Sequence, residues 1–309
     1  MRRSIAIGLL IATFIPVGAS AQNCEPDSVA VQILGSGGPR INPLRASTSY
    51  LLWVGDRATV LVDMGGGALA RFGQAQAKVS DLSLVAVSHL HPDHISDLPA
   101  FLWLSHEVRK APLRIVGPSG NDAAPDFATF LSRLFDEKNG AFPVLGAALG
   151  GMRRDLPGGP RPGGSVQLDV GVFDATKAEP STVFDRDGIS VTALGIPHGN
   201  MPTLAYRVKV RNMSIVFSSD QTGTNPRFVD FAKGANILIM HLAYGEGVRD
   251  HPLHAGPDMV GRVAQEAGVG QLIVSHIGIF DLDAALAEIK KNYTGPLTVG
   301  ADLQCTPVR

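Results

Sequence analysis

Ser88-His89-Leu90-His91-Pro92-Asp93-His94 is the stretch of the chain that points most directly to a fold and a chemistry. It places three imidazoles and one carboxylate within six positions, directly after a short apolar segment. In an extended backbone, residues i and i+2 project to the same side, so His89 and His91 can bind one cation. Asp93 and His94 follow at the start of a predicted helix and can face a second cation. Imidazole and carboxylate ligands without a thiolate suit zinc first, with iron or manganese as alternatives.

Three further apolar segments each end in a side chain of a metal-binding type. These side chains are His198, Asp220 and His276. In α/β folds, the loops just beyond buried strands commonly hold the functional site. A single histidine or aspartate there is more often structural, but together with the first cluster the set predicts one shared metal centre.

Short segments rich in Val, Ile and Leu, bounded by Gly, Pro or Asp, predict strands along the chain. They are Val29–Leu34, Ser49–Val54, Ala58–Asp63, Leu84–Ser88, Leu113–Val116, Ile189–Leu194, Thr203–Val210, Ser214–Ser218, Asn236–His241, Gln271–Ser275 and Leu297–Val299. Helical patterns lie at Ser96–Trp103, Phe127–Leu134, Met259–Ala267 and Leu282–Ile289. The mixture predicts a layered α/β domain. The segment Gly150–Gly164, rich in Gly and Pro, reads as a surface loop.

The composition excludes several classes of protein. Of the 309 residues, 45% are hydrophobic and 18% are charged, which is the balance of a globular chain rather than a disordered one. The formal net charge of −1 offers no electrostatic footprint for a nucleic-acid backbone. Only one apolar run is long enough to concern a membrane, which excludes a protein with several spans.

That apolar run has the layout of a secretory signal peptide. Arg2 and Arg3 precede the stretch Ile5–Val17, and Ala19-Ser20-Ala21 is a small-residue cleavage pattern. The run is shorter than the ~20 residues of a membrane span. We therefore predict a signal peptide at residues 1–21, a single domain at 22–309, a periplasmic or secreted location, and no stable membrane association after cleavage. Removing two positive charges gives a mature net charge of −1 − 2 = −3.

The only two cysteines lie close to the two ends of the predicted mature chain. An oxidising compartment permits a disulfide between Cys24 and Cys305. Two separate thiols are the alternative, because the sequence does not show whether the Cα atoms come within bonding range.

The combination His89-x-His91-x-Asp93-His94, followed by His198, Asp220 and His276, resembles the metallo-β-lactamase superfamily. The segments Leu34–Pro39 and Val62–Gly67 also resemble segments of the ribonuclease Z-like and arylsulfatase-like branch of this superfamily. The position of His254 resembles that branch as well. The resemblance implies a four-layer αββα sandwich with two metals in a cleft along one edge.

The same resemblance implies two Zn²⁺ ions, with manganese or iron as alternatives, and a role for each ligand. His89, His91 and His198 would bind one ion, Asp93, His94 and His276 the other, and Asp220 would bridge them. Two dications about 3.5–4 Å apart bind a shared water and lower its pKa, which supplies hydroxide near neutral pH. Two divalent ions carry a charge of +4, two aspartates contribute −2 and a hydroxide contributes −1. The centre therefore keeps a charge of about +1, which favours an anionic ester as substrate.

Further residues receive roles around this centre. Asp93 is predicted to orient the hydroxide or to accept its proton, and His254 to donate a proton to the leaving group. Asp63 and Asp97 are predicted to hold ligand imidazoles. His241, at the end of a predicted strand, either lines the site or is simply buried.

Departures from the family pattern narrow the substrate. β-Lactamases of the superfamily usually have Cys or Ser where Asp220 stands. Members that process tRNA carry a long insertion between the residues matched by His198 and Asp220, which here are 22 positions apart. The His-Glu-Ala-Thr stretch of those members is His241-Leu242-Ala243-Tyr244 in this chain, so the glutamate is missing here.

We therefore expect an exported binuclear metallohydrolase acting on a small anionic ester, an aryl sulfate or a phosphodiester. A lactonase or other carboxylic-ester hydrolase, and a metal-binding module without catalysis, are the alternatives. The expected partner is a small-molecule ester and not a nucleic acid, and a homo-oligomer is left open.

Overall fold

The computed structural model describes Cys24, residues 28–105, Arg109, residues 112–149 and residues 167–309. The predicted signal peptide at 1–21 and the predicted loop Gly150–Gly164 lie outside the described residues. Within those residues, no helix has the length and apolar character to cross a membrane.

Two seven-stranded sheets form the centre of the fold. The first has the order β14-β1-β2-β3-β4-β5-β6, and the second has the order β13-β12-β11-β10-β9-β8-β7. The strands of the first sheet are β1 Val29–Gly35, β2 Ser49–Val54, β3 Arg57–Val62, β4 Leu84–Ala86, β5 Leu113–Pro118, β6 Leu168–Phe173 and β14 Cys305–Pro307. Those of the second are β7 Ser181–Arg186, β8 Ile189–Ile196, β9 Thr203–Val210, β10 Met213–Phe217, β11 Ile237–His241, β12 Gln271–Ser275 and β13 Leu297–Val299.

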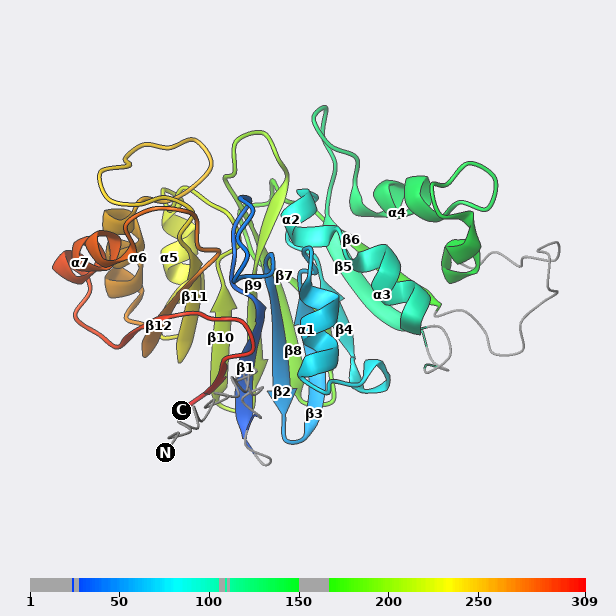
Figure 1. The fold of residues 1–309 in the computed structure, drawn as a ribbon, viewed down its shortest axis with the longest axis horizontal. Coiled ribbons are helices and arrows are strands. Elements are labelled where there is room, and N and C mark those ends of the chain that lie inside the picture. Colours follow the sequence, from blue (N-terminus) through cyan, green and yellow to red (C-terminus); the bar gives the residue numbers. More distant parts are fainter. Residues whose placement is uncertain (1–23, 25–27, 106–108, 110–111, 150–166) are drawn as a thin grey trace, which may run out of the picture.

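Helices cover the outer face of each sheet (Figure 1). They are α1 Ala68–Gln74, α2 Pro92–Ile95, α3 Leu98–Ser105, α4 Phe127–Phe135, α5 Pro226–Ala232, α6 Pro257–Ala267 and α7 Leu282–Asn292, with short 3₁₀ turns at η1 Val79–Asp81 and η2 Pro143–Leu149. Local chemistry sets several ends: the Asp126 side chain caps α4, and the Asp281 side chain caps α7. Gly268, in the left-handed conformation, ends α6.

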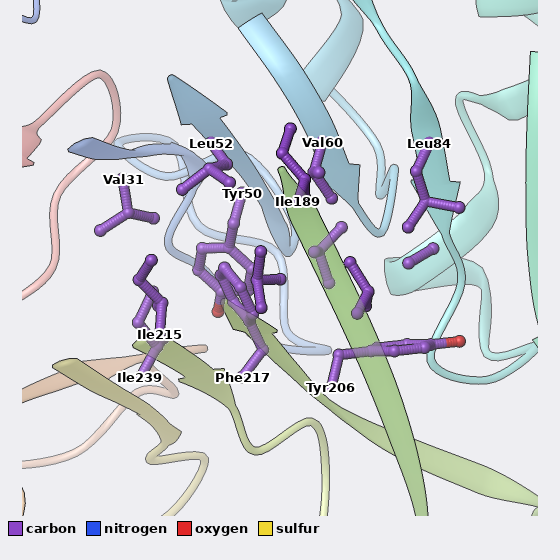
Figure 2. Close-up of a cluster of buried hydrophobic side chains, with 14 of the residues drawn as sticks. Val31, Tyr50, Leu52, Val60, Leu84, Ile189, Tyr206, Ile215, Phe217 and Ile239 are labelled. Carbon is purple, nitrogen blue, oxygen red and sulfur yellow. The ribbon is translucent and has the colours of Figure 1, made fainter. Parts of the chain in front are cut away.

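Three hydrophobic clusters hold the layers together. The first lies between the sheets, where Tyr50 and Leu52 of one sheet meet Ile215 and Phe217 of the other (Figure 2). The second packs the first sheet against α1, α3 and α4, and the third packs the second sheet against α5, α6 and α7. The result is a four-layer αββα sandwich, and the predicted fold class is confirmed.

Strand direction brings the predicted metal-binding side chains to one edge. Strand β9 pairs antiparallel with both β8 and β10, whereas β10, β11 and β12 pair in parallel. Strands β8, β10, β11 and β12 therefore all end at the same edge of the second sheet. The end of β4 is tied to that sheet, because the Tyr206 hydroxyl donates to the Val87 carbonyl at 2.7 Å and the Leu204 amide to the Ser88 carbonyl at 3.0 Å.

All eleven predicted strands are present, with ends that differ by a few residues at most. The helix predicted at Ser96–Trp103 is α3, which begins at Leu98 and ends at Ser105, and a separate short helix, α2, precedes it. The chain breaks between them because the Asp97 amide bonds to the Met64 carbonyl at 3.0 Å, and Pro99 has no amide hydrogen with which to continue α2.

The structure joins Cys24 to Cys305 in a disulfide with a Cα–Cα distance of 5.5 Å. Cys305 lies on β14, the edge strand that pairs with β1. The bond therefore ties Cys24 to the last strand of the first sheet, and it closes a span of 281 positions in the sequence.

Loss of this disulfide is predicted to destabilise the fold by about 2–4 kcal/mol, because the unfolded chain regains the conformational freedom that the long loop closure removes. The measurement is urea unfolding of the wild-type chain and of the Cys24→Ser/Cys305→Ser double variant. Reductant should lower the midpoint of the wild type and leave that of the double variant unchanged. Equal midpoints for wild type and variant without reductant would contradict this role.

Candidate metal centre

Asp220 is the residue on which the site converges. It lies just beyond β10, its side chain is 2% exposed, and the preceding Ser219 holds a positive φ of 52°. Its Oδ2 atom lies 3.5 Å from His94 Nε2 and 3.6 Å from His198 Nε2. Its Oδ1 atom lies 3.3 Å from His276 Nε2. A single carboxylate thus faces imidazoles from three distant segments of the chain.

A first group of nitrogens gathers on one side of Asp220. His91 Nδ1 lies 3.0 Å from His89 Nε2 and 3.2 Å from His198 Nε2. His198 donates its Nδ1–H to the Leu253 carbonyl at 2.8 Å, which leaves Nε2 with a lone pair. His89, His91, His198 and Asp220 together could hold one ion.

A second group lies on the other side. His276 Nε2 is 3.2 Å from Asp93 Oδ2, and His94 Nε2 is 3.7 Å from the same oxygen. His94, Asp220, His241 and His276 also have ligand atoms close enough to share an ion. The structure therefore brings together all seven side chains that the sequence predicted, and it adds His241 to them.

His94 is held by two partners. Its Nδ1–H donates to Asp63 Oδ2 at 2.8 Å, and the same carboxylate accepts from the Ser88 amide at 2.7 Å and the Ser88 hydroxyl at 2.8 Å. The Ser88 oxygen lies 3.0 Å from His89 Nδ1. Asp63 thus fixes the rings of two candidate ligands, as predicted, and it does so at a positive φ of 57°.

The prediction for Asp97 was wrong. Its Oδ2 accepts from the Leu69 amide at 2.9 Å in the first turn of α1, and it contacts no imidazole among the described residues. The sequence could not separate the two aspartates, because both stand near the cluster. Only the left-handed turn at Asp63 directs its carboxylate inward.

His241 is a partner of Asp220 that the sequence left undecided. Its Nδ1–H donates to Asp220 Oδ1 at 2.6 Å, and its Nε2 accepts from the Tyr50 hydroxyl at 2.9 Å. Tyr50 comes from β2 of the other sheet, so this chain of hydrogen bonds crosses the sandwich. Nothing in the sequence pointed to Tyr50, which reads as an ordinary strand residue.

His254 lies at the rim of the site and is 5% exposed. Its Nδ1 is 3.9 Å from Asp220 Oδ2, and its ring centre is 5.2 Å from that of His198. Leu242, which stands where the tRNA-processing members of the family have a glutamate, is fully buried in the core. Burial, opposed in part by Asp220, lowers the pKa of His254 to about 3.

Burial and charge set the protonation of the other groups. Burial lowers the pKa of His89 well below its usual value, which keeps the ring neutral, as a metal ligand must be. Burial opposes charge on His94 as well, but the carboxylates of Asp220 and Asp63 raise its pKa well above the usual value. Burial also opposes charge on Asp220, yet the neighbouring imidazoles of His276 and His94 bring its pKa well below the usual range.

The donor set fits divalent cations. Lone pairs of His89 and His198 converge on His91, which has at most one Nδ1 proton to offer them. The buried His94 Nε2 has no hydrogen-bond partner among the described residues, although two carboxylate oxygens lie within 4 Å. Such crowded, unsatisfied groups are costly unless a cation takes the place of the missing protons.

Gly38 allows the loop after β1 to approach His276. A Cβ atom on Gly38 would lie 2.9 Å from His276 Nδ1. The Ile277 amide also donates to the Ser36 carbonyl at 2.8 Å. His276 itself has a positive φ of 55°, and backbone strain of this kind collects at functional sites.

Comparisons with known proteins agree with this geometry. Residues 42–182 match the family model of the metallo-beta-lactamase superfamily. A ribonuclease Z of Mycolicibacterium paratuberculosis is 28% identical over 263 residues, covering 80% of this chain and 85% of its own.

Solved structures show the same fold. The metallo-beta-lactamase fold protein YhfI from Bacillus subtilis superposes with a TM-score of 0.67 at 21% identity, over 91% of this chain and 99% of its own. The short form of human tRNase Z gives a TM-score of 0.67 at 18% identity, with the same coverage.

The Asp63→Asn substitution is predicted to lower the affinity for Zn²⁺ about 10–100-fold, because His94 loses the carboxylate that orients it. Competition with a chromogenic chelator measures the affinity. Asp97→Asn is the matched control and should bind Zn²⁺ as the wild type does. Wild-type affinity in Asp63→Asn would show that this carboxylate does not support a metal ligand.

Proposed function

We propose that the chain is a member of the metallo-β-lactamase superfamily, whose family model and fold it matches, and that it is a binuclear metal-dependent hydrolase of small anionic esters, phosphodiesters foremost. The observation that carries the proposal is the convergence of six other ligand-type side chains on the buried Asp220. A metal-binding module without catalysis would not need a complete set.

We assign His89, His91 and His198 to one ion, Asp93, His94 and His276 to the other, and Asp220 to both. Two divalent ions, when bound, supply an activated water near neutral pH and stabilise negative charge on the substrate. Zinc is the metal that this set of imidazoles and carboxylates favours, with manganese or iron as alternatives.

The residues of the chain supply orientation and proton transfer. Asp63 and His241 hold His94 and Asp220 in place through hydrogen bonds of 2.8 and 2.6 Å. Asp93, whose side chain is 15% exposed, can accept a proton from water. An anionic ester beside His254 would favour the protonated imidazole, which is the form that donates a proton to the leaving oxygen.

We also propose that the protein is exported and acts in the periplasm or outside the cell. The Cys24–Cys305 disulfide supports this location, because such bonds persist in oxidising compartments. The signal-peptide pattern at residues 1–21 agrees with it.

RNA is the second candidate substrate, because the relative from M. paratuberculosis is named ribonuclease Z. Two observations favour a small ester instead. Only β9, β10 and their short connections lie between His198 and Asp220, so no arm is inserted there. The mature net charge of −3 also offers no general attraction for a polyanion.

The Asp220→Asn substitution is predicted to lower kcat/KM for bis(p-nitrophenyl) phosphate by about 10²–10³-fold or more, because it removes the charge shared by both ion sites. Asp230→Asn, at an exposed position of α5, is the control and should retain full activity. The same assay includes p-nitrophenyl sulfate, a lactone and a precursor tRNA. Undiminished phosphodiester turnover by Asp220→Asn would refute the assignment, and exclusive cleavage of the tRNA would select the second candidate.

The His254→Asn substitution is predicted to slow hydrolysis of phenyl phosphodiesters by about 10²–10⁴-fold, because phenolate needs a proton as it leaves. The loss for p-nitrophenyl esters should be clearly smaller, since p-nitrophenolate is the better leaving group. The measurement is kcat for the two series under the same conditions. Equal losses for both would rule out His254 as the proton donor.

A further inference from the structure

A cavity of about 420 Å³ lies beside the metal centre, between three loops. One loop follows β11, one follows β12, and the third follows β1. Figure 1 shows the first two at the upper left of the molecule. The cavity is lined by Arg40, Ala243, Tyr244, Gly245, Glu246, Val248, Ile279, Phe280, Asp281 and Ala284.

The cavity adjoins the proposed reaction centre at Tyr244. The Tyr244 ring is 5.5 Å from the His254 ring, which in turn is 5.5 Å from the His276 ring. Both loops continue directly from strands that end in site residues, His241 on β11 and His276 just after β12. An ester bound at the ions can therefore extend a substituent into the cavity.

Aromatic and aliphatic side chains form part of the walls, beside the charged groups of Arg40, Glu246 and Asp281. Tyr244, Ile279 and Phe280 present aromatic and aliphatic surface, and Ile279 is 66% exposed. Gly245 permits the arrangement, because a Cβ atom there would lie 2.7 Å from Phe280 Cβ. The Gly278 amide donates to the Leu242 carbonyl at 3.2 Å and joins the two loops at their base.

The charges at the rim restrict the occupant further. One cation, Arg40, stands among two carboxylates, Glu246 and Asp281, so the lining has a net charge of −1. A second anionic group on the substrate would be repelled there, whereas an uncharged ring would not.

A second cavity, of about 390 Å³, is a poorer site for such a ring. It is lined by His251 and His254 with the charged groups of Arg249 and Arg262, and it has no aromatic side chain other than these imidazoles. The rings of Tyr244 and His251 lie 4.3 Å apart and separate the two cavities.

We propose that the first cavity binds an uncharged aromatic substituent of the ester, and that Tyr244, Ile279 and Phe280 determine this preference. The proposal rests on the proposed function. A volume of this size accommodates a substituted ring, and aromatic walls contact it by stacked or edge-to-face packing.

The test uses phenylphosphonate and methylphosphonate as competitive inhibitors of bis(p-nitrophenyl) phosphate hydrolysis by the metal-loaded protein. Phenylphosphonate should bind the wild type about tenfold more tightly, because its ring buries apolar surface. A 4-carboxyphenylphosphonate should lose most of that advantage.

Phe280→Ala and Ile279→Asn should each reduce the ratio of the two inhibition constants at least about threefold. Ile279→Asn changes an exposed side chain, so it remains informative if Phe280→Ala fails to fold. Ile41→Ser is the control, because Ile41 is 96% exposed and does not line the cavity.

A wild-type ratio below about twofold, or a ratio that both variants leave unchanged, would overturn the proposal. If the metal-loaded protein hydrolyses no ester, the proposed function fails. The same ratio is then measured by calorimetric titration of the two phosphonates, which still decides whether the cavity selects an aromatic ring.

Discussion

The carboxylate of Asp220 is the constraint on which the site depends. It is buried just beyond the end of β10, and imidazoles from five other segments lie within 4 Å of its oxygens. A buried charge is costly unless it is paired or bound to metal. The surrounding fold holds the groups that meet this cost, because the strands of the second sheet and the left-handed turns at Asp63, Ser219 and His276 place them around Asp220.

The sandwich explains how distant residues reach that point. Strands β8, β10, β11 and β12 run in one direction, so each of their ends delivers one polar side chain to the same edge. The first sheet contributes the turn after β4, and Tyr50 reaches across the core to His241. Because the apolar clusters fix the two sheets against each other, the polar groups are positioned before any ligand arrives.

Much of this could be predicted from the sequence, for physical reasons that differ between elements. The buried strands have strong apolar patterns, and the histidines that crowd together after β4 are typical of a metal site. The three strands that were not predicted have weaker patterns: β6 and β7 are mostly half-buried or exposed, and β14 has only three residues. Asp63 and Asp97 could not be told apart, because their roles depend on backbone φ angles and on long-range contacts. Tyr50 carries no local signal at all.

The most direct test of the central claim is anomalous X-ray diffraction from crystals of the zinc-loaded protein. The account predicts two peaks, one about 2.0–2.2 Å from nitrogens of His89, His91 and His198, and one at the same distance from nitrogens of His94 and His276. Asp220 should contact both. A single peak, or two peaks that do not share Asp220, would contradict the account.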